Sequence, residues 1–286
     1  MTTPADDAAR RAFWTTSMDE ADEFMAQIAA YPVEECGEPM APLAEAAAAA
    51  GVEVAFTDQP HLHGMPRQFY LRKGLIPRFV AVAAEMNARG WVLKVEDAYR
   101  TVAMQQASGV SKSLLTTVLR LVQWECGEEQ PPVELLCRRI GALVASSPKV
   151  GTHMSGSAMD VSVFQRDNGE EVDRGVTYVQ ISECTPMASP FVSETAQRNR
   201  QEITALFARH GFVTYPYEFW HYNSGDAYEE LLNGTGRPAR YGAVHMNPDG
   251  TVTPIDNPCA PLNSTEVIRE LMEQLLAQQR EARASS

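Results

Sequence analysis

Two short segments far apart in the sequence carry side chains that can bind a metal ion. The first, GTHMSGSAMD, places His153 seven positions before Asp160, and the small residues between them allow the backbone to turn tightly beside an ion. The second, EFWH, places Glu218 three positions before His221, with Trp220 as an apolar wall next to them. Two imidazoles and one carboxylate form a three-ligand zinc site with an open fourth position, which is typical of catalytic zinc.

The predicted site holds one zinc ion per chain, bound by His153, Asp160 and His221. Zinc lowers the pKa of a bound water from about 15.7 to about 7, so a nearby base can generate a hydroxide nucleophile. Glu218 is the candidate base, which would pass the proton on to the leaving amine of a hydrolysed amide. Arg100, at the end of the segment VEDAYR, is the candidate for stabilising the tetrahedral oxyanion.

The composition limits the classes of partner. The chain of 286 residues is 44% hydrophobic and 21% charged, which is typical of a soluble globular protein. Its net charge of −13 disfavours general affinity for nucleic acid or anionic membranes and favours a small-molecule partner. No stretch approaches transmembrane length, and the first residues lack a secretory pattern. With five scattered cysteines and no CxxC spacing, these features predict a cytoplasmic protein with reduced thiols.

Hydrophobic periodicity predicts a mixture of helices and strands. Asp160 is expected on a strand that ends in a hairpin turn at 167–169, and 212–222 is expected to be strand material carrying Glu218 and His221. The alanine-rich segment 42–51 is predicted as a helix, although it could be a linker. The remaining predicted strands cover 52–56, 67–71 and 91–100, and the remaining predicted helices cover 18–30, 77–89, 101–146 with a break at 127–132, 195–210 and the tail from 263.

The motifs HxxGxAxD, ExWH and an upstream DAYR occur in a familiar combination. Together they resemble the zinc D-alanyl-D-alanine dipeptidases and related DD-carboxypeptidases of peptidase family M15, over roughly residues 52–225. The FYLRKGLIP stretch is also similar to the dipeptidase branch. The resemblance implies an α+β fold with a central antiparallel sheet that carries the zinc site and is flanked by helices. It also implies the same roles for the three metal ligands, for Glu218 as general acid and base, and for Arg100.

The resemblance implies three parts of the chain. Residues 1–51 are expected to be a helical N-terminal extension, and residues 52–262 a zinc peptidase domain with a helical insertion at about 101–146. Residues 263–286 are expected to form a C-terminal helix that packs on the body or contacts a partner. The implied activity is hydrolysis of a short peptide, with D-Ala-D-Ala from peptidoglycan metabolism as the leading substrate.

Two departures from the family concern substrate binding, for which Gly151, Glu183 and Trp220 are the candidates. The dipeptidases usually have serine where this chain has Gly151, and SECTPMASPF stands where a DMGTxFD-like segment supplies an aspartate for the substrate amine. Glu183 is the candidate replacement. The alternatives are a DD-carboxypeptidase, a hydrolase of another specialised peptide, and a non-catalytic zinc-binding interaction module. The His61 and His63 pair is either a second metal-binding element or part of a loop.

Overall fold

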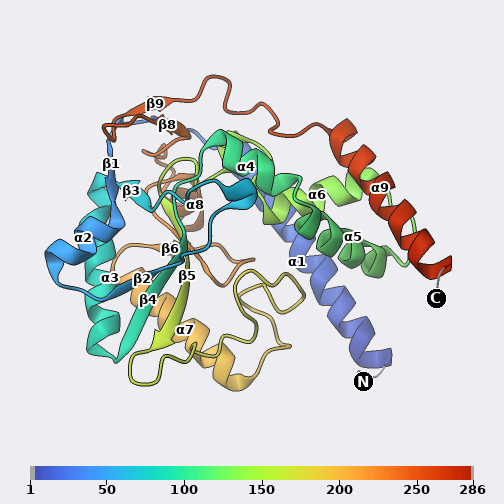
Figure 1. Cartoon of the computed structure of the whole chain (residues 1–286), viewed down its shortest axis with the longest axis horizontal. Coiled ribbons are helices and arrows are strands. Elements are labelled where there is room, and N and C mark those ends of the chain that lie inside the picture. Colours follow the sequence, from blue (N-terminus) through green and yellow to red (C-terminus); the bar gives the residue numbers. More distant parts are fainter. Residues whose placement is uncertain (1–3, 285–286) are drawn as a thin grey trace.

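The computed structural model describes residues 4–284, in which a sheet region and a helical region lie side by side (Figure 1). The strands are β1 (Met40–Pro42), β2 (Val54–Phe56), β3 (Tyr70–Arg72), β4 (Trp91–Asp97), β5 (Ala158–Gln165), β6 (Val213–Thr214), β7 (His221–Asn223), β8 (Val244–Met246) and β9 (Val252–Pro254). The α-helices are α1 (Pro4–Ala30), α2 (Leu43–Ala50), α3 (Ile76–Ala88), α4 (Val102–Gly109), α5 (Lys112–Cys126), α6 (Val133–Leu143), α7 (Glu194–Arg209), α8 (Ala227–Leu232) and α9 (Thr265–Ala284).

A five-stranded mixed sheet with the order β2-β4-β5-β7-β6 lies at the centre of the sheet region. The α+β class is confirmed, but the prediction of a purely antiparallel central sheet is wrong, because β2 runs parallel to β4. The other neighbouring pairs are antiparallel. Between β2 and β4 the chain passes through α3, and a helical crossover of this kind allows two neighbouring strands to run in the same direction.

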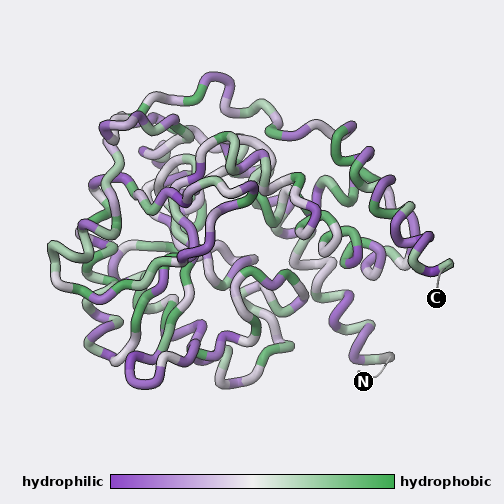
Figure 2. The backbone as a smooth tube through the Cα atoms, viewed as in Figure 1, coloured by the Kyte–Doolittle hydropathy of each residue, from purple (hydrophilic) through white to green (hydrophobic). Residues whose placement is uncertain are grey.

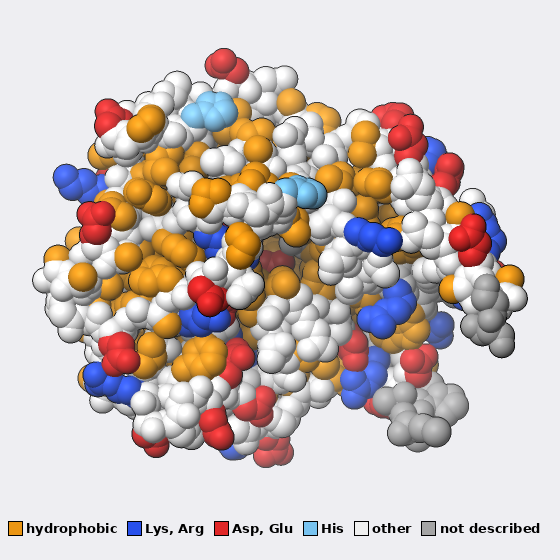
Figure 3. Space-filling model, viewed as in Figure 1, with side chains coloured by type: hydrophobic (Ala, Val, Ile, Leu, Met, Phe, Trp, Pro, Cys, Tyr) orange, Lys and Arg blue, Asp and Glu red, His pale blue; other side chains and the backbone are white. Residues whose placement is uncertain are grey.

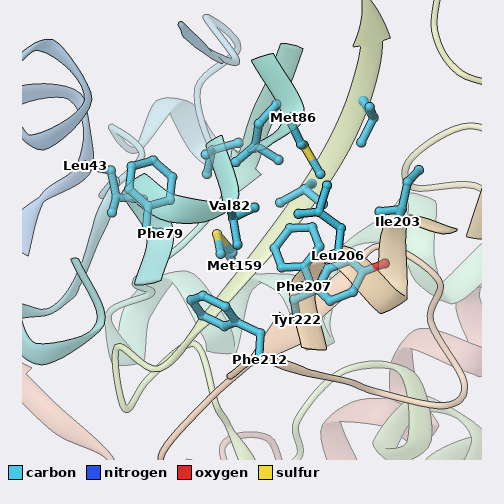
Figure 4. Close-up of a cluster of buried hydrophobic side chains, with 14 of the residues drawn as sticks. Leu43, Phe79, Val82, Met86, Met159, Ile203, Leu206, Phe207, Phe212 and Tyr222 are labelled. Carbon is cyan, nitrogen blue, oxygen red and sulfur yellow. The ribbon is translucent and has the colours of Figure 1, made fainter. Parts of the chain in front are cut away.

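The main core lies between the sheet and the two helices α3 and α7 (Figure 4). Tyr222 of β7 stacks on Phe207 of α7, with ring centroids 3.8 Å apart and an interplanar angle of 11°. Successive side chains of a strand point to opposite faces, so the residue before Tyr222, His221, faces away from this core. The same alternation on β5 buries Met159 in the core and turns Asp160 to the other face. The core therefore positions both strand-borne ligand candidates on one side of the sheet.

We expect Phe207→Ala to destabilise the fold by about 3–5 kcal/mol, because it leaves a cavity in the best-packed part of the core. Phe207 is fully buried at 0% exposure. Urea denaturation followed by circular dichroism measures the change. Leu232→Ala is the control, because Leu232 is 40% exposed on α8 and its truncation should change the stability by no more than about 0.5 kcal/mol. Equal losses in the two variants would contradict this description of the core.

A second core joins α1, α5, α6 and α9, which form the helical region on the right of Figure 1. Trp14 of α1 donates a hydrogen bond from Nε1 to Glu125 of α5 at 3.1 Å, and Arg139 of α6 also donates to Glu125, from Nε at 3.0 Å. The C-terminal helix packs on this body, since Ile268 and Met272 are buried in the same cluster. The proposed division into an extension, a peptidase domain and a tail helix stays a prediction.

The structure changes several predicted boundaries. Helix α1 begins at Pro4, not near residue 18. Segment 42–51 is a helix, ended by Gly51 in the left-handed conformation (φ 64°). The predicted helical stretch 101–146 consists of three helices, α4 to α6. Hydrophilic residues interrupt the hydrophobic ones along the chain (Figure 2), and no helix within residues 4–284 is long and apolar enough to cross a membrane.

Candidate metal centre and cavity

His153, Asp160 and His221 are brought together by the pairing of β5 with β7. Asp160 lies directly opposite His221 in the antiparallel register, and the loop before β5 supplies His153. Oδ1 of Asp160 lies 3.2 Å from Nε2 of His153 and 3.0 Å from Nδ1 of His221. One ligand atom from each residue lies within 4.8 Å of the others, and all three residues are buried. This arrangement leaves one carboxylate oxygen and two ring nitrogens converging on a single point.

The second nitrogen of each imidazole has its own partner. Nδ1 of His153 donates to the carbonyl oxygen of Ala98 at 2.6 Å, which makes Nε2 the free nitrogen. Nε2 of His221 lies 3.0 Å from Oγ1 of Thr152, which leaves Nδ1, on the side of Asp160, available to a metal ion. Burial lowers the pKa of His221, and a neutral imidazole is the form that binds metal. Outer partners that fix the tautomer and ring orientation are typical of histidine metal ligands, so the donor set fits a zinc ion.

The other oxygen of Asp160 is held by two neighbours. Nη2 of Arg100 donates to Oδ2 of Asp160 at 3.0 Å, and the hydroxyl of Tyr178 donates to the same oxygen at 3.3 Å. Burial opposes ionisation of this carboxyl group, but the two histidines and Arg100 hold the pKa of Asp160 well below its usual range. Asp160 is therefore an ionised carboxylate with one oxygen directed to the two histidine rings.

A buried ion-pair network fixes Arg100. Its Nε donates to Oδ2 of Asp97 at 2.8 Å, and Arg67 forms a second ion pair with the same oxygen at 2.9 Å. Burial opposes the charge of the guanidinium, but Asp97 and Asp160 raise the pKa of Arg100. The backbone N–H of Arg100 also donates to the carbonyl oxygen of His153 at 3.2 Å. Arg100 is thus a permanent cation with little freedom to move away from the ligand group.

Glu218 lies in the turn between β6 and β7, not on a strand as the sequence predicts. The turn is closed by hydrogen bonds from the N–H of Glu218 to the carbonyl of Tyr215 and from the N–H of His221 to the carbonyl of Glu218, both 3.2 Å. Oε2 of Glu218 is 4.0 Å from Nδ1 of His221. Burial and the negative charge of Asp160 raise the pKa of Glu218 well above its ordinary value. A carboxyl group of this kind is suited to accept and return a proton near neutral pH.

A cavity of about 470 Å³ contains the ligand group, and Arg100, Glu218, Gly151 and Trp220 also line it. Figure 3 shows a hollow near the middle of this face, with acidic side chains at its floor. A Cβ atom at Gly151 would lie 3.3 Å from the side chain of Met154, so that side chain takes up part of the space that a larger residue would need.

The structure does not bring Glu183 to the cavity. Its Oε1 accepts a hydrogen bond of 2.6 Å from Nη1 of Arg10, and Glu183 is absent from the cavity lining. His61 is buried in the lining, where burial lowers its pKa to about 4, whereas His63 is exposed and outside the lining. The role of Glu183 in substrate binding stays a prediction that its position does not favour.

Arg67 and Tyr178, which hold Asp97 and Asp160 at the ligand group, were missed in the sequence. Arg67 is the first residue of the predicted strand 67–71 but lies before β3 in the structure, and no local pattern shows that it reaches Asp97. Tyr178 belongs to Asp173–Val179, which reads DRGVTYV and is itself similar to the DMGTxFD pattern. Tyr178 and Val179 of this segment line the cavity, whereas Ser182 is the one residue of 182–191 that does. In this register Val179 stands where the pattern has its last aspartate.

The sequence profile of peptidase family M15, described as D-Ala-D-Ala dipeptidase, matches residues 67–236. The chain belongs to this family. A D-alanyl-D-alanine dipeptidase from Synechocystis sp. is 25% identical over 224 residues, which is 69% of this chain and 86% of that protein. A D-alanyl-D-alanine dipeptidase from Enterococcus faecium is 31% identical over 71 residues, 25% of this chain and 35% of that protein. A solved structure of the LdcB LD-carboxypeptidase has 18% identity and a TM-score of 0.37, covering 73% of this chain and 80% of that one.

Membership of family M15 makes the chain a peptidase, and zinc is the metal that the family implies. The matched residues 67–236 include the ligand group, Arg67, Arg100, Tyr178 and Glu218. Helices α1 and α9 lie outside the matched range. The M15 match therefore covers the ligand group and the residues around it, but neither His61 of the cavity lining nor helices α1 and α9.

Proposed function

We propose that this M15 peptidase is a zinc-dependent dipeptidase that hydrolyses a D,D-dipeptide, with D-Ala-D-Ala as the substrate. His153, Asp160 and His221 would hold one zinc ion per chain. The observation that carries the proposal is the position of Glu218 and Arg100 beside the converging ligand atoms, within one cavity. The dipeptide itself is taken from the names of the relatives, and it connects the chain to the turnover of peptidoglycan.

Each residue has a separate task in the proposed reaction. Bound zinc would polarise the scissile carbonyl and lower the pKa of water. The carboxylate of Glu218 takes a proton from the attacking water as its oxygen adds to the carbonyl carbon. Glu218 then gives that proton to the nitrogen of the leaving amino acid as the C–N bond breaks. The guanidinium of Arg100, fixed by two carboxylates, offers positive charge where the oxyanion develops.

A second candidate activity is release of the last residue from a longer peptide, as in a carboxypeptidase. The cavity lining favours a carboxypeptidase in one respect. The carboxylates of the lining belong to Asp97, Asp160 and Glu218, and each already has a partner or a role in the proposed reaction. None of them is free to receive the ammonium group of an unblocked dipeptide. Gly151 also lacks the hydroxyl that the dipeptidases usually offer at this place.

Alanine release from matched peptides by the zinc-loaded protein tests the proposal. We expect D-Ala-D-Ala to be cleaved and L-Ala-L-Ala to be left intact. Cleavage of N-acetyl-D-Ala-D-Ala but not of the free dipeptide would establish the carboxypeptidase alternative in its place. No cleavage of any of the D- and L-peptides would reject both and favour the non-catalytic zinc-binding module.

A further inference from the structure

The cavity extends beyond the ligand group along one face of α5. Ser113, Thr117 and Arg120 line it and are spaced four and three residues apart, so they lie on one side of the helix. At 1.5 Å per residue, the wall that they form is about 10 Å long. This wall gives the cavity polar groups beyond those that take part in the proposed reaction.

The charges along the cavity are already balanced near the ligand group. Asp97 is bound by Arg67 and Arg100, and Asp160 is bound by Arg100 and the two histidines. Glu218 is the proposed acid and base. No other Asp or Glu lines the cavity within residues 4–284. An ammonium group would therefore enter this cavity without a free carboxylate to pair with.

Arg120 differs from the other two arginines that line the cavity, because its charge has no partner in the part of the chain that the structure describes. It is exposed, it lines the cavity, and its guanidinium makes no hydrogen bond or ion pair with any residue in the described range 4–284. The two other lining arginines are both engaged by Asp97. Figure 3 shows basic side chains to the right of the hollow, over the part of Figure 1 where α5 lies. This end of the cavity therefore offers unpaired positive charge next to two hydroxyl groups.

We propose that Arg120, with Ser113 and Thr117, forms a subsite that binds a carboxylate of the peptide substrate. A guanidinium binds a carboxylate with two parallel hydrogen bonds, and hydroxyl groups can donate to the remaining lone pairs. The inference rests on the proposed peptidase function and adds the group of the substrate that is recognised: a carboxylate, which D-Ala-D-Ala and a longer peptide both carry. The carboxylate is either the C-terminus of the peptide or an acidic group on the amino side of the scissile bond.

The loop of residues 178–182, which lines the same cavity, is held in place by a buried arginine that contacts the segments around it. Arg200 of α7 is 1% exposed and donates to the carbonyl oxygens of Arg174 at 2.8 Å, Pro186 at 2.8 Å and Cys184 at 2.7 Å. Its guanidinium also stacks on the ring of Phe219 at 4.4 Å. These contacts bracket residues 178–182, which line the cavity. The subsite therefore has a preorganised neighbour, which limits the conformational entropy that this loop loses when a peptide binds.

Isothermal titration of zinc-loaded protein in a Glu218→Gln background tests the subsite without turnover. The ligands are N-succinyl-D-Ala-D-Ala, N-acetyl-D-Ala-D-Ala and the C-terminal amides of both. We expect Arg120→Gln to weaken binding about fivefold for the peptides that carry the recognised carboxylate, and to leave their counterparts without it unchanged. Lys112→Gln is the matched control, because Lys112 is exposed on the same helix but does not line the cavity.

The source of the carboxylate follows from which pair of peptides responds. If Arg120→Gln removes the difference in affinity between the succinyl and acetyl peptides, the recognised carboxylate lies on the amino side. If it removes the difference in affinity between the acids and their amides, the carboxylate is the C-terminus. Equal binding of every peptide to the parent and to Arg120→Gln, an equal loss in Lys112→Gln, or no binding at all would overturn the subsite. Arg120-dependent binding, together with no cleavage of D-Ala-D-Ala or of these peptides by the zinc-loaded parent protein that keeps Glu218, would reject the proposed hydrolysis alone.

Discussion

Glu218→Gln is expected to lower kcat by about 10²–10⁴-fold while the protein still binds one zinc ion per chain. The amide of glutamine has nearly the same shape as the carboxyl group but cannot take a proton from water or return it to the leaving amine. Glu218 is not one of the three converging ligand residues, so the metal should remain. Alanine release from the cleaved peptide gives kcat, and mass spectrometry of the metal content gives the stoichiometry.

Glu183→Gln is the matched control for this substitution. It makes the same chemical change at a carboxylate that pairs with Arg10 and does not line the cavity. We expect kcat and KM of Glu183→Gln to stay within about twofold of the parent protein, because a salt bridge at the surface contributes at most about 1 kcal/mol. A clear rise in KM would instead restore Glu183 as a substrate-binding residue. Full turnover by Glu218→Gln would refute the proposed mechanism.

The candidate ligands could be predicted from the sequence because their pattern is local. The sequence alone shows a histidine and an aspartate seven positions apart, and a glutamate and a histidine three positions apart. No knowledge of the fold is needed to recognise these spacings. The structure then brings His153, Asp160 and His221 within reach of one another through the register of β5 and β7.

Residues whose proximity depends on tertiary packing could not be predicted in this way. Arg67 reaches Asp97 from another part of the chain, and Tyr178 reaches Asp160 from a loop without regular structure. Neither contact has a periodic or spaced signature. The parallel pairing of β2 with β4 was missed for a related reason, since hydrophobic patterning indicates a strand but not the direction of its neighbour.

The segment 212–222 shows where propensity alone misleads. Its aromatic residues favour a strand, yet Val213–Thr214 and His221–Asn223 are short and a turn separates them. Proline at position 216 cannot donate to a sheet ladder, which makes an uninterrupted strand unfavourable there. The turn has a consequence for function, because it places Glu218 beside His221 instead of along the strand.

His221→Ala is expected to remove both zinc binding and activity. The substitution leaves two protein ligands, and loss of a direct ligand should weaken zinc affinity by more than the roughly 10–100-fold typical of losing an outer partner of a ligand. Zinc that binds the folded state raises Tm by mass action, so the parent protein should melt at a higher temperature with zinc than with a chelator. In His221→Ala that difference should disappear. Differential scanning fluorimetry measures it without reference to any substrate.

His245→Ala is the matched control, because His245 is exposed on β8 and does not line the cavity. It should keep the zinc-dependent rise in Tm and the activity of the parent. Stoichiometric zinc in His221→Ala would contradict the assignment of the ligand group. The two variants separate metal binding from proton transfer. Glu218→Gln should retain the metal without the reaction, and His221→Ala should lose both. That outcome would follow only if the register of β5 and β7 builds the metal site while the turn before β7 supplies the proton-transfer group.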